Sequence, residues 1–507
     1  MAVNSEDLRF ILGLKLKGLR QERGYSLTQA ADRAGLSVSY LSEIEKGRKY
    51  PKPDKLIKLA RALDVPYDEL VSLQVGDELE TVKSVFSSTF VHEFPFELFG
   101  VKPEDVFGLV TEQPGKTAAL IRTILEIGQM YDVQVEHFLF AALRSYQQMH
   151  RNYFEDLETA AAEYRSERGW PAGRPPGEER MRAALEAYGY EIDEGTLPEH
   201  PDLWGFRSVL LEGEPPKLLV NGRLMPSQRA FIYGREIGYL HLGLEERAVT
   251  GSWLEIDSFD QVLNNFKASY FAGALMIDRG ALVRDLEIFF GRPGWSDEAF
   301  LGLMKRYEAT PEMFFYRLSQ LASRFFGLDE VYFMRFHNQA GSDAFRLTKV
   351  LNMSRVPVPH GIGLNEHYCR RWPAMKLLRE LASRQRAGGV EDPLVRAQRS
   401  RFIDEDAEFF VVSMSRPLSL TEGTNSCVSL GFLMNEAFRQ QVRFWDDPGI
   451  ERVDVNLTCE RCPLTPGACG DRVAAPTLYE RDLRRDRQDR ALAELMEAWR
   501  LETVTGA

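Results

Sequence analysis

The chain has 507 residues, a net charge of −12 and a hydrophobic content of 44%. This length exceeds what one hydrophobic core serves, so two to four domains are expected, and the acidic balance argues against nucleic-acid binding by the chain as a whole. Five cysteines cannot pair completely, the first residues lack a signal-peptide pattern, and the apolar runs are too short to cross a bilayer. We therefore expect a cytoplasmic protein with free thiols and no membrane partner.

The first 75 residues differ from the rest in charge. They hold thirteen Lys and Arg against ten Asp and Glu, so this segment is basic within an acidic chain. Apolar residues recur there at helical spacing in five short segments, and Ser or Gly stands at several expected helix ends, for example Ser37 and Gly35. This pattern predicts a five-helix domain over residues 1–75.

Two of these helices, joined by "AGLS", have the spacing of a DNA-reading pair. The stretch "SLTQAADRAGLSVSYLSEIEKGRKYPKPDKLIKLARAL" resembles the Cro/repressor-like helix-turn-helix family. The start of the second helix would face base edges, Gln29 would by resemblance touch the DNA backbone and brace that helix, and the cations just beyond would meet phosphates. The residues expected at this interface are Gln29, Ser37, Ser39, Tyr40, Glu43, Lys46, Arg48, Lys49 and Lys52. The alternative is a small helical bundle whose cations form only a solvated face.

Residues 76–167 are expected to be largely helical. Their apolar stripe suits a linker or a dimerisation region, and packing within their own domain is the alternative. The stretch "WPAGRPPGEER" then predicts a break in the helix, because it is rich in Pro and Gly.

The helix expected in "FIYGREIGYLHLG" follows three short strand candidates. This segment, residues 168–305, resembles the metallopeptidase-like domain of phage antirepressors, whose helix carries H-E-x-x-H so that two histidines bind zinc beside a general-base Glu. Here Arg235 and Tyr239 stand at the histidine positions beside Glu236, and residues 264–270 offer no acidic ligand. His241 falls on another face of the helix. We expect a retained α+β fold without peptidase chemistry, and no enzyme.

Residues 306–475 alternate helix and strand candidates around a Gly/Pro-rich loop. A sheet with a covering helix and a long loop is a common enclosure for a small ligand, so an α/β ligand-sensing domain is expected, followed by a charged helix over residues 476–507. The chain as a whole is expected to be multidomain and mostly α, with α+β parts.

The stretch "TCERCPLTPGACG" gathers Cys459, Cys462 and Cys469. Thiolates at this spacing can hold one metal or one cluster, and Cys369 in the Gly/Pro-rich loop is the expected fourth ligand, with His367 or His360 as replacements. The spacing suits an iron–sulfur cluster and structural zinc equally. A few surface thiols beside a turn are the alternative. The fifth thiol, Cys427, lies in an apolar run and is expected in a core.

The order of these parts resembles that of the short-chain fatty-acyl transcriptional regulators, which include regulators of propionate catabolism and of the glyoxylate bypass. "CERCPLTPGACGDRVAAP" and the first 73 residues carry this resemblance. It implies a double-stranded DNA operator, an acyl-CoA-like effector and a [4Fe–4S] cluster rather than zinc. A helix-turn-helix module usually binds as a dimer, so a homodimer is expected. The alternatives are a redox- or oxygen-sensing iron–sulfur regulator without an organic ligand and a metallopeptidase that acts on a repressor.

An acyl-CoA needs cations for its phosphates and an apolar slot for its acyl chain. Strands of the expected sensor domain supply candidate cations, although scattered arginines on a solvated strand face are the plainer reading. The candidates are Arg335, Arg346, Lys349 and Arg355.

Overall fold

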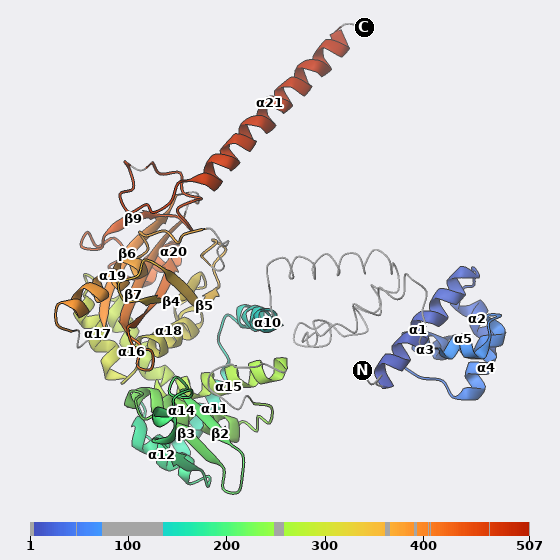
Figure 1. Ribbon diagram of the computed structural model, residues 1–507, viewed down its shortest axis with the longest axis horizontal. Helices are drawn as coiled ribbons and strands as arrows, with labels where there is room; N and C mark the ends of the chain where they lie inside the picture. The colour runs from blue at the N-terminus through green and yellow to red at the C-terminus, as the bar shows by residue number, and fades with distance from the viewer. Residues whose placement is uncertain are drawn as a thin grey trace. The chain divides into compact units, whose positions relative to one another are not determined.

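A computed structural model describes most of the chain (Figure 1). The described residues are 5–46, 48–72, 135–247, 258–359, 366–389, 393–403, 405, 407–465 and 467–505. The chain divides into two compact units, residues 1–146 with 256–262, and residues 147–255 with 263–507. None of the helices in the described ranges is long and apolar enough to cross a bilayer. Residues 73–134, which include most of the middle region expected over residues 76–167, and the candidate ligand His360 lie outside the described residues.

The N-terminal helices form a small domain with its own core. They are α1 (Ser5–Glu22), α2 (Leu27–Ala34), α3 (Val38–Glu45), α4 (Pro53–Ala62) and α5 (Tyr67–Val71). Ser26 and Gln29 form a reciprocal capping box at the start of α2, and Gly35 ends that helix in the left-handed region, at φ 60°. Leu16 and Ile44 are fully buried at the centre of the domain. The five expected helices are therefore present, ended by the caps that the sequence indicates.

The second unit contains helices and two sheets. Its first elements are the end of α10 (Val135–Met149), α11 (Glu155–Glu167), α12 (Gly177–Glu186), β1 (Glu191–Asp193), α13 (Thr196–Glu199), β2 (Ser208–Leu211), β3 (Lys217–Val220) and α14 (Pro226–His241). Arg151 and Asn152 take left-handed φ values of 51° and 54°, which end the helical run between α10 and α11. The Pro/Gly-rich stretch after α11 is held in place, because the Arg165 guanidinium donates to the carbonyls of Pro171 and Arg174.

The first sheet has three strands in the order β1-β3-β2, with β1 parallel and β2 antiparallel to β3. Helix α14 follows β3 and packs closely on α15 (Phe259–Met276). Side chains at Gly234 and Gly238 would press on Ala272 and Ala268, at 3.2 and 3.1 Å, so small residues are needed where these helices meet. The three strands and the helix expected for residues 168–305 are all found.

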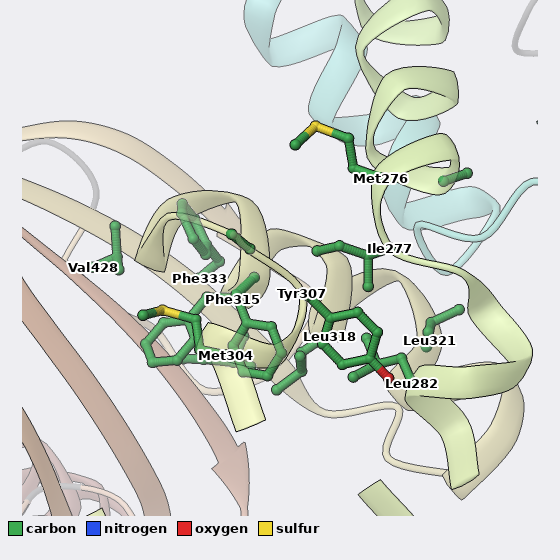
Figure 2. Close-up of a cluster of buried hydrophobic side chains, with 14 of the residues drawn as sticks. Met276, Ile277, Leu282, Met304, Tyr307, Phe315, Leu318, Leu321, Phe333 and Val428 are labelled. Carbon is green, nitrogen blue, oxygen red and sulfur yellow. The ribbon is translucent and has the colours of Figure 1, made fainter. Parts of the chain in front are cut away.

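A large hydrophobic core joins the helical and sheet parts of this unit. The helices α16 (Arg279–Phe290), α17 (Asp297–Arg306) and α18 (Pro311–Phe326) supply much of it. Figure 2 shows Phe315, Leu318 and Leu321 gathered with Tyr307, and with Phe333 on the neighbouring strand. Because the same core contains residues from both 168–305 and 306–475, these stretches pack as one body. The boundary expected at residue 305 stays a prediction.

The second sheet has six strands in the order β5-β4-β8-β7-β6-β9, antiparallel except for the pair β6 and β9. The strands are β4 (Val331–Gln339), β5 (Phe345–Asn352), β6 (Leu394–Phe402), β7 (Ala407–Pro417), β8 (Thr424–Leu433) and β9 (Arg452–Val455). Alternate residues of β4 point to opposite faces, so Phe333 enters the core with α18, whereas Tyr332 and Phe336 enter a second core with α19 (Pro373–Arg386). The sheet is thus covered by helices on both faces.

The chain ends beyond this sheet. The short helix α20 (Glu436–Gln441) precedes β9, the cysteine stretch follows β9, and α21 (Thr477–Thr505) is the last helix. Figure 1 shows α21 running away from the six-stranded sheet. The charged terminal helix expected over residues 476–507 agrees with α21.

Candidate functional site

The start of α3 presents a polar surface on the N-terminal domain. Ser37 caps this helix, its Oγ accepting the Tyr40 N–H at 3.2 Å, and its hydroxyl lies 3.3 Å from that of Ser39. Both serines are exposed and Tyr40 is half-buried. Gln29, also exposed, uses its side-chain oxygen to accept the Ser26 N–H at 2.8 Å. These residues, predicted to face DNA, therefore lie near the starts of α2 and α3.

Cations flank the far end of α3. Lys46, Arg48, Lys49 and Lys52 are all exposed. Arg48 lies 3.2 Å from the Glu43 carboxylate, and the Lys49 ammonium lies 5.9 Å from the Tyr40 ring centroid. These cations are thus close to the base-reading candidates, and exposed charges of this kind contribute salt-dependent attraction to phosphates.

A buried ion pair that the sequence reading missed fixes α3 against α1. Arg20 donates to both carboxylate oxygens of Glu45, at 2.7 and 2.9 Å, and the two side chains are 13% and 6% exposed. A signal was available, since Arg20 follows the buried Leu16 by four positions and Glu45 follows the buried Leu41 by four. Charged residues on an apolar stripe indicate a buried pair, because an unpaired charge there costs too much.

In α14 the residues at the expected motif positions form ion pairs rather than a set of zinc ligands. Glu236 is 1% exposed and pairs with Arg235 at 3.3 Å and more closely with Arg247. The Arg247 guanidinium also lies 4.4 Å from the ring centroid of Tyr239. A guanidinium therefore supplies positive charge beside the motif positions, and Glu236 is engaged in ion pairs. His241 packs edge-on to Tyr164, at 5.0 Å between ring centroids.

The cysteine stretch lies against the segment that contains Cys369. An antiparallel bridge joins Tyr368 to Thr458, so the Cys369 N–H donates to the Leu457 carbonyl and the Cys459 N–H donates to the His367 carbonyl. Cys369, Cys459, Cys462 and Cys469 are each at most 8% exposed. The backbone thus brings Cys369, the expected fourth ligand, beside the segment that contains Cys459.

The thiols influence one another electrostatically. Burial, the largest effect, raises the pKa of Cys369 to about 11, and the neighbouring Cys459 and Cys462 add to this rise. Burial likewise raises the pKa of Cys462, which Cys469 also affects. Within the described ranges, however, no three His, Cys, Asp or Glu side chains converge closely enough to hold a metal ion. The donor set suits a thiolate site, and its side chains would have to turn toward a common centre.

Two residues that the sequence reading missed shape this loop. Arg472 donates to the carbonyls of Cys459 and Cys462, at 2.9 and 2.8 Å, and to that of Leu464. The Glu460 carboxylate accepts the His367 N–H at 2.9 Å and lies 2.8 Å from the His367 ring. His367, a replacement candidate ligand, is thus already paired. Cys427 lies apart in the core with α19 and is fully buried, as its apolar surroundings suggested.

A cluster of cations lies on the α18 face of the six-stranded sheet. Arg335 on β4 donates to Glu312 at 2.5 Å, and opposite it on β5 the Lys349 ammonium lies 3.9 Å from the Tyr316 ring centroid. Their electrostatic neighbours Arg207, Arg235 and Arg416 come from other elements and were not among the candidates. Four of these five cations act directly on one carboxylate, that of Glu312.

Partial burial changes the acid–base behaviour of this cationic cluster. Burial lowers the pKa of Lys349 to about 8, against the attraction of Glu312. Burial acts to raise the pKa of Glu312, but Arg335 and Lys349 overcome it and lower this pKa to about 2. Burial and Arg335 lower the pKa of His337 to about 4, and its Nε2 has no hydrogen-bond partner in the part of the chain that the structure describes. The cluster thus holds excess positive charge in a partly desolvated place.

The other two candidate cations are exposed and are not paired with Arg335 or Lys349 across the strands. Arg346 is exposed and faces His337 across the strand pair. Arg355 has a side chain 95% exposed and lies 3.8 Å from Glu330. Of the four strand cations, Arg335 and Lys349 are therefore the ones brought together.

The N-terminal geometry defines a helix-turn-helix domain, and comparisons with known proteins agree. Residues 16–70 match the family model described as Helix-turn-helix. An uncharacterised HTH-type transcriptional regulator, y4dJ of Sinorhizobium fredii, is 39% identical over 66 residues, 13% of this chain and 86% of that protein. The chain therefore belongs to the HTH-type transcriptional regulators.

Other relatives differ in how much they share. Transcriptional regulator ClgR of Mycobacterium tuberculosis is 36% identical over 72 residues, 14% of this chain and 63% of ClgR. HTH-type transcriptional regulator RamB of the same species is 23% identical over 285 residues, 52% of this chain and 57% of RamB. The chain thus spans less than two thirds of either relative. A solved "Mycobacterium tuberculosis transcriptional regulator" covers 66% of this chain and 93% of its own, with 19% identity and a TM-score of 0.46, too low to establish a shared fold.

Proposed function

We propose that this protein regulates transcription by placing α3 in the major groove of an operator. The observation that carries the proposal is the exposed start of α3, which Ser37 caps and where Ser39 is also exposed. Four exposed cations follow the end of the same helix. Short hydroxyl side chains can read base edges, and the cations would add affinity without sequence choice. A pair of modules on a two-fold operator suits this class, so a homodimer is part of the proposal.

Selection from random duplexes tests DNA reading by the full chain. Enriched sequences should share a two-fold motif, and Ser39→Ala should change base preference at one position of each half-site. Lys52→Ala should instead weaken binding to all sequences alike. Lys305→Ala, at an exposed lysine of α17, should leave both affinity and base preference unchanged. Failure to enrich any sequence at low salt would refute operator recognition.

We further propose that an acyl-CoA-like metabolite controls this binding through the cationic cluster. Support comes from the four cations that act on Glu312, namely Arg207, Arg335, Lys349 and Arg416, because CoA phosphates need several donors and partly desolvated arginines bind them more strongly than exposed ones. The ligand can shift DNA affinity only if it binds one conformation better, with coupling of about 1–3 kcal/mol expected for such regulators.

Calorimetric measurement of short-chain acyl-CoA binding to the full chain tests the effector site. Arg335→Ala should weaken binding, whereas Arg355→Ala removes an exposed cation outside the cluster and serves as the matched control. Operator binding measured by fluorescence anisotropy should shift in the presence of acyl-CoA. Equal curves with and without the thioester would refute ligand control while leaving DNA binding intact.

We propose, finally, that Cys369, Cys459, Cys462 and Cys469 hold a [4Fe–4S] cluster, with zinc as the alternative occupant. Four nearly buried thiols in one neighbourhood support a shared site, and a cluster of this kind supplies redox chemistry when bound. Arg472 holds the carbonyls of this loop, and would thereby keep its cysteines available to one centre.

Anaerobic purification with an absorption spectrum and metal analysis distinguishes the occupants. A cluster predicts a broad band near ~400 nm with iron and sulfide, and paired Cys459→Ala and Cys462→Ala changes should remove both. Cys427→Ala is the control and should leave them unchanged. Zinc in a colourless protein would exclude the cluster, and a cluster whose oxidation alone alters DNA binding would favour a redox sensor without an organic ligand.

A metallopeptidase remains the least supported function. Glu236, which would act as the general base, is paired with two arginines, and neither histidine of the motif is present. Metal retained after loss of Cys459 and Cys462 would be the observation in its favour.

A further inference from the structure

Arg370, which follows Cys369, has a buried guanidinium with an unused donor. The residue is 4% exposed, and its Nε has no hydrogen-bond partner in the described part of the chain. The rest of the guanidinium is fixed, because one amino group donates to the Asp343 carbonyl at 2.8 Å and the central carbon lies 4.6 Å from the Phe345 ring centroid. Buried donors are almost always paired, so this Nε–H requires an acceptor nearby.

Arg370 shares its counter-ion with a second arginine. Arg379 lies 2.7 Å from the Asp343 carboxylate, and Arg370 lies 3.3 Å from it. Both guanidiniums also lie over the Phe345 ring. Water reaches Arg379, whose side chain is 40% exposed, whereas Arg370 is buried. One carboxylate cannot neutralise two guanidiniums, and the excess positive charge is costly at the one from which water is excluded.

Arg472 brings a second positive charge to the cysteine loop. Its guanidinium donates to the carbonyls of Cys459, Cys462 and Leu464, and every acceptor that the structure describes for it is a carbonyl oxygen. Its Nε also lacks a partner among the described residues. The two arginines act on different cysteines, because Arg472 interacts electrostatically with Cys462, and Arg370 with Cys459.

Backbone N–H groups also reach the cysteine sulfurs. The Cys369 sulfur accepts hydrogen bonds from the N–H groups of Asn456 and Arg371, and the Cys462 sulfur accepts one from that of Leu464. Donors of this kind stabilise a thiolate relative to a thiol, and hydrogen bonds to ligand sulfurs help to set the reduction potential of an iron–sulfur cluster. These surroundings therefore suit negatively charged sulfur.

We propose that Arg370 and Arg472 are the counter-charges of a four-cysteine centre, and that the Arg370 Nε–H donates to a cysteine sulfur of that centre. This inference rests on the cysteine site of the proposed function. Four thiolates give zinc, or a [4Fe–4S] core with two positive charges, an excess of two negative charges, which two arginines balance. Arg370 is thus a positioning residue that favours an anionic centre and sets how readily that centre accepts an electron.

The reduction potential of the anaerobically purified full chain tests this role. Arg370→Gln removes a positive charge, so it should shift the one-electron equilibrium about tenfold toward the oxidised centre, or about 59 mV to lower potential. Arg370→Lys keeps the charge and should recover most of this shift. Arg379→Gln is the matched control, since Arg379 shares Asp343 and Phe345 with Arg370, and it should change the potential far less. Equal potentials in the two glutamine variants would overturn the inference while leaving the cluster in place.

A variant of opposite sign tests the inference even if Arg370→Gln fails to fold. The Asp343 side chain is 54% exposed, so Asp343→Asn removes a charge without disturbing a core. It leaves Arg370 less neutralised, and the equilibrium should therefore shift severalfold toward the reduced centre. No shift, or a shift toward the oxidised centre, would contradict the role of Arg370.

Metal competition separates this inference from the identity of the centre. A protein isolated with zinc would refute the iron–sulfur proposal, and titration with a chelator would then measure the same charge balance. Arg370→Gln should hold zinc about tenfold more weakly than Arg379→Gln. Equal zinc affinities would overturn the inference, and a full chain that holds neither metal at its cysteines would refute both proposals.

Discussion

The two basic surfaces of this protein are built in opposite ways. Around α3 the cations are exposed, and the side-chain exposure of Arg48 is 41%. In the cationic cluster the guanidinium of Arg335 is fixed between Thr348 and Glu312, and its side chain is 22% exposed. Water screens charge at the first surface far more than at the second. The same residue types should therefore give salt-dependent, undiscriminating affinity at one surface and selective, pH-dependent binding at the other.

The largest expected effect is at the cationic cluster. Arg335→Ala should weaken acyl-CoA binding by about 10- to 100-fold, because a hydrogen bond to a charged group contributes about 1.5–3 kcal/mol. Arg335→Lys should recover part of this loss, since it keeps the charge without the paired donors. Calorimetry at two salt concentrations measures both. If Arg335→Ala weakens acyl-CoA binding no more than Arg355→Ala does, the two basic surfaces do not differ as described.

The next effect concerns the exposed cations. Replacing Lys46, Lys49 and Lys52 together by Ala should reduce the salt dependence of DNA binding. Each phosphate that loses its lysine lowers the slope of log K against log salt by about 0.9, hence by about 2.7 for all three. Anisotropy titrations over a salt series give this slope. Base preference should stay the same, and a changed preference with an unchanged slope would assign these lysines to base reading instead.

A smaller effect is the pH dependence of anion binding, which we expect at the cationic cluster and not at the surface around α3. Lys349 has a pKa of about 8, so it is mostly charged at pH 7 and mostly neutral at pH 9. Anion binding at the cluster should therefore fall severalfold as pH rises through this range. Lys349→Arg should abolish the fall, because arginine stays protonated. DNA binding over the same range provides the internal comparison, and an effector affinity that is flat with pH in the unaltered protein would contradict the expected titration.

The smallest effect tests how α3 is held. Ser37→Ala removes the oxygen that accepts the Tyr40 N–H, and an N-cap of this kind contributes about 1 kcal/mol to stability. Thermal unfolding of the N-terminal transition measures the loss. Ser37→Asp keeps a capping acceptor and should restore stability while impairing DNA binding by its charge. A stability loss in both variants would mean that the cap is not what fixes this end of α3.

The N-terminal domain was predictable because its signals are local. Ser26, Gly35 and Ser37 each act within a few residues, so the caps and the lengths of α2 and α3 could be inferred from sequence. The cationic cluster was predictable only in part. Arg335 and Lys349 face each other on adjacent strands, whereas Arg207 and Arg416 join them from elements more than 60 residues away, and no spacing rule connects such positions.

The cysteine site shows the same limit in another form. The spacing of Cys459, Cys462 and Cys469 indicated a shared centre, and the choice of Cys369 rested on residue type and on its place in the Gly/Pro-rich loop. The bridge between Tyr368 and Thr458 places these segments side by side, but the part played by Arg472 had no local signal. Carbonyl acceptors have no sequence signature, so the residue that organises them is visible only in three dimensions.

Glu460 also links the cysteine loop to the helix that follows it. Its carbonyl sets the first turn of α21, and it is the immediate neighbour of Cys459. A tilt of about 10° at that carbonyl would displace the far end of a helix about 44 Å long by about 8 Å. A shift of the loop at Cys459 that tilts this first turn would therefore be amplified along α21 into a larger displacement of its far end.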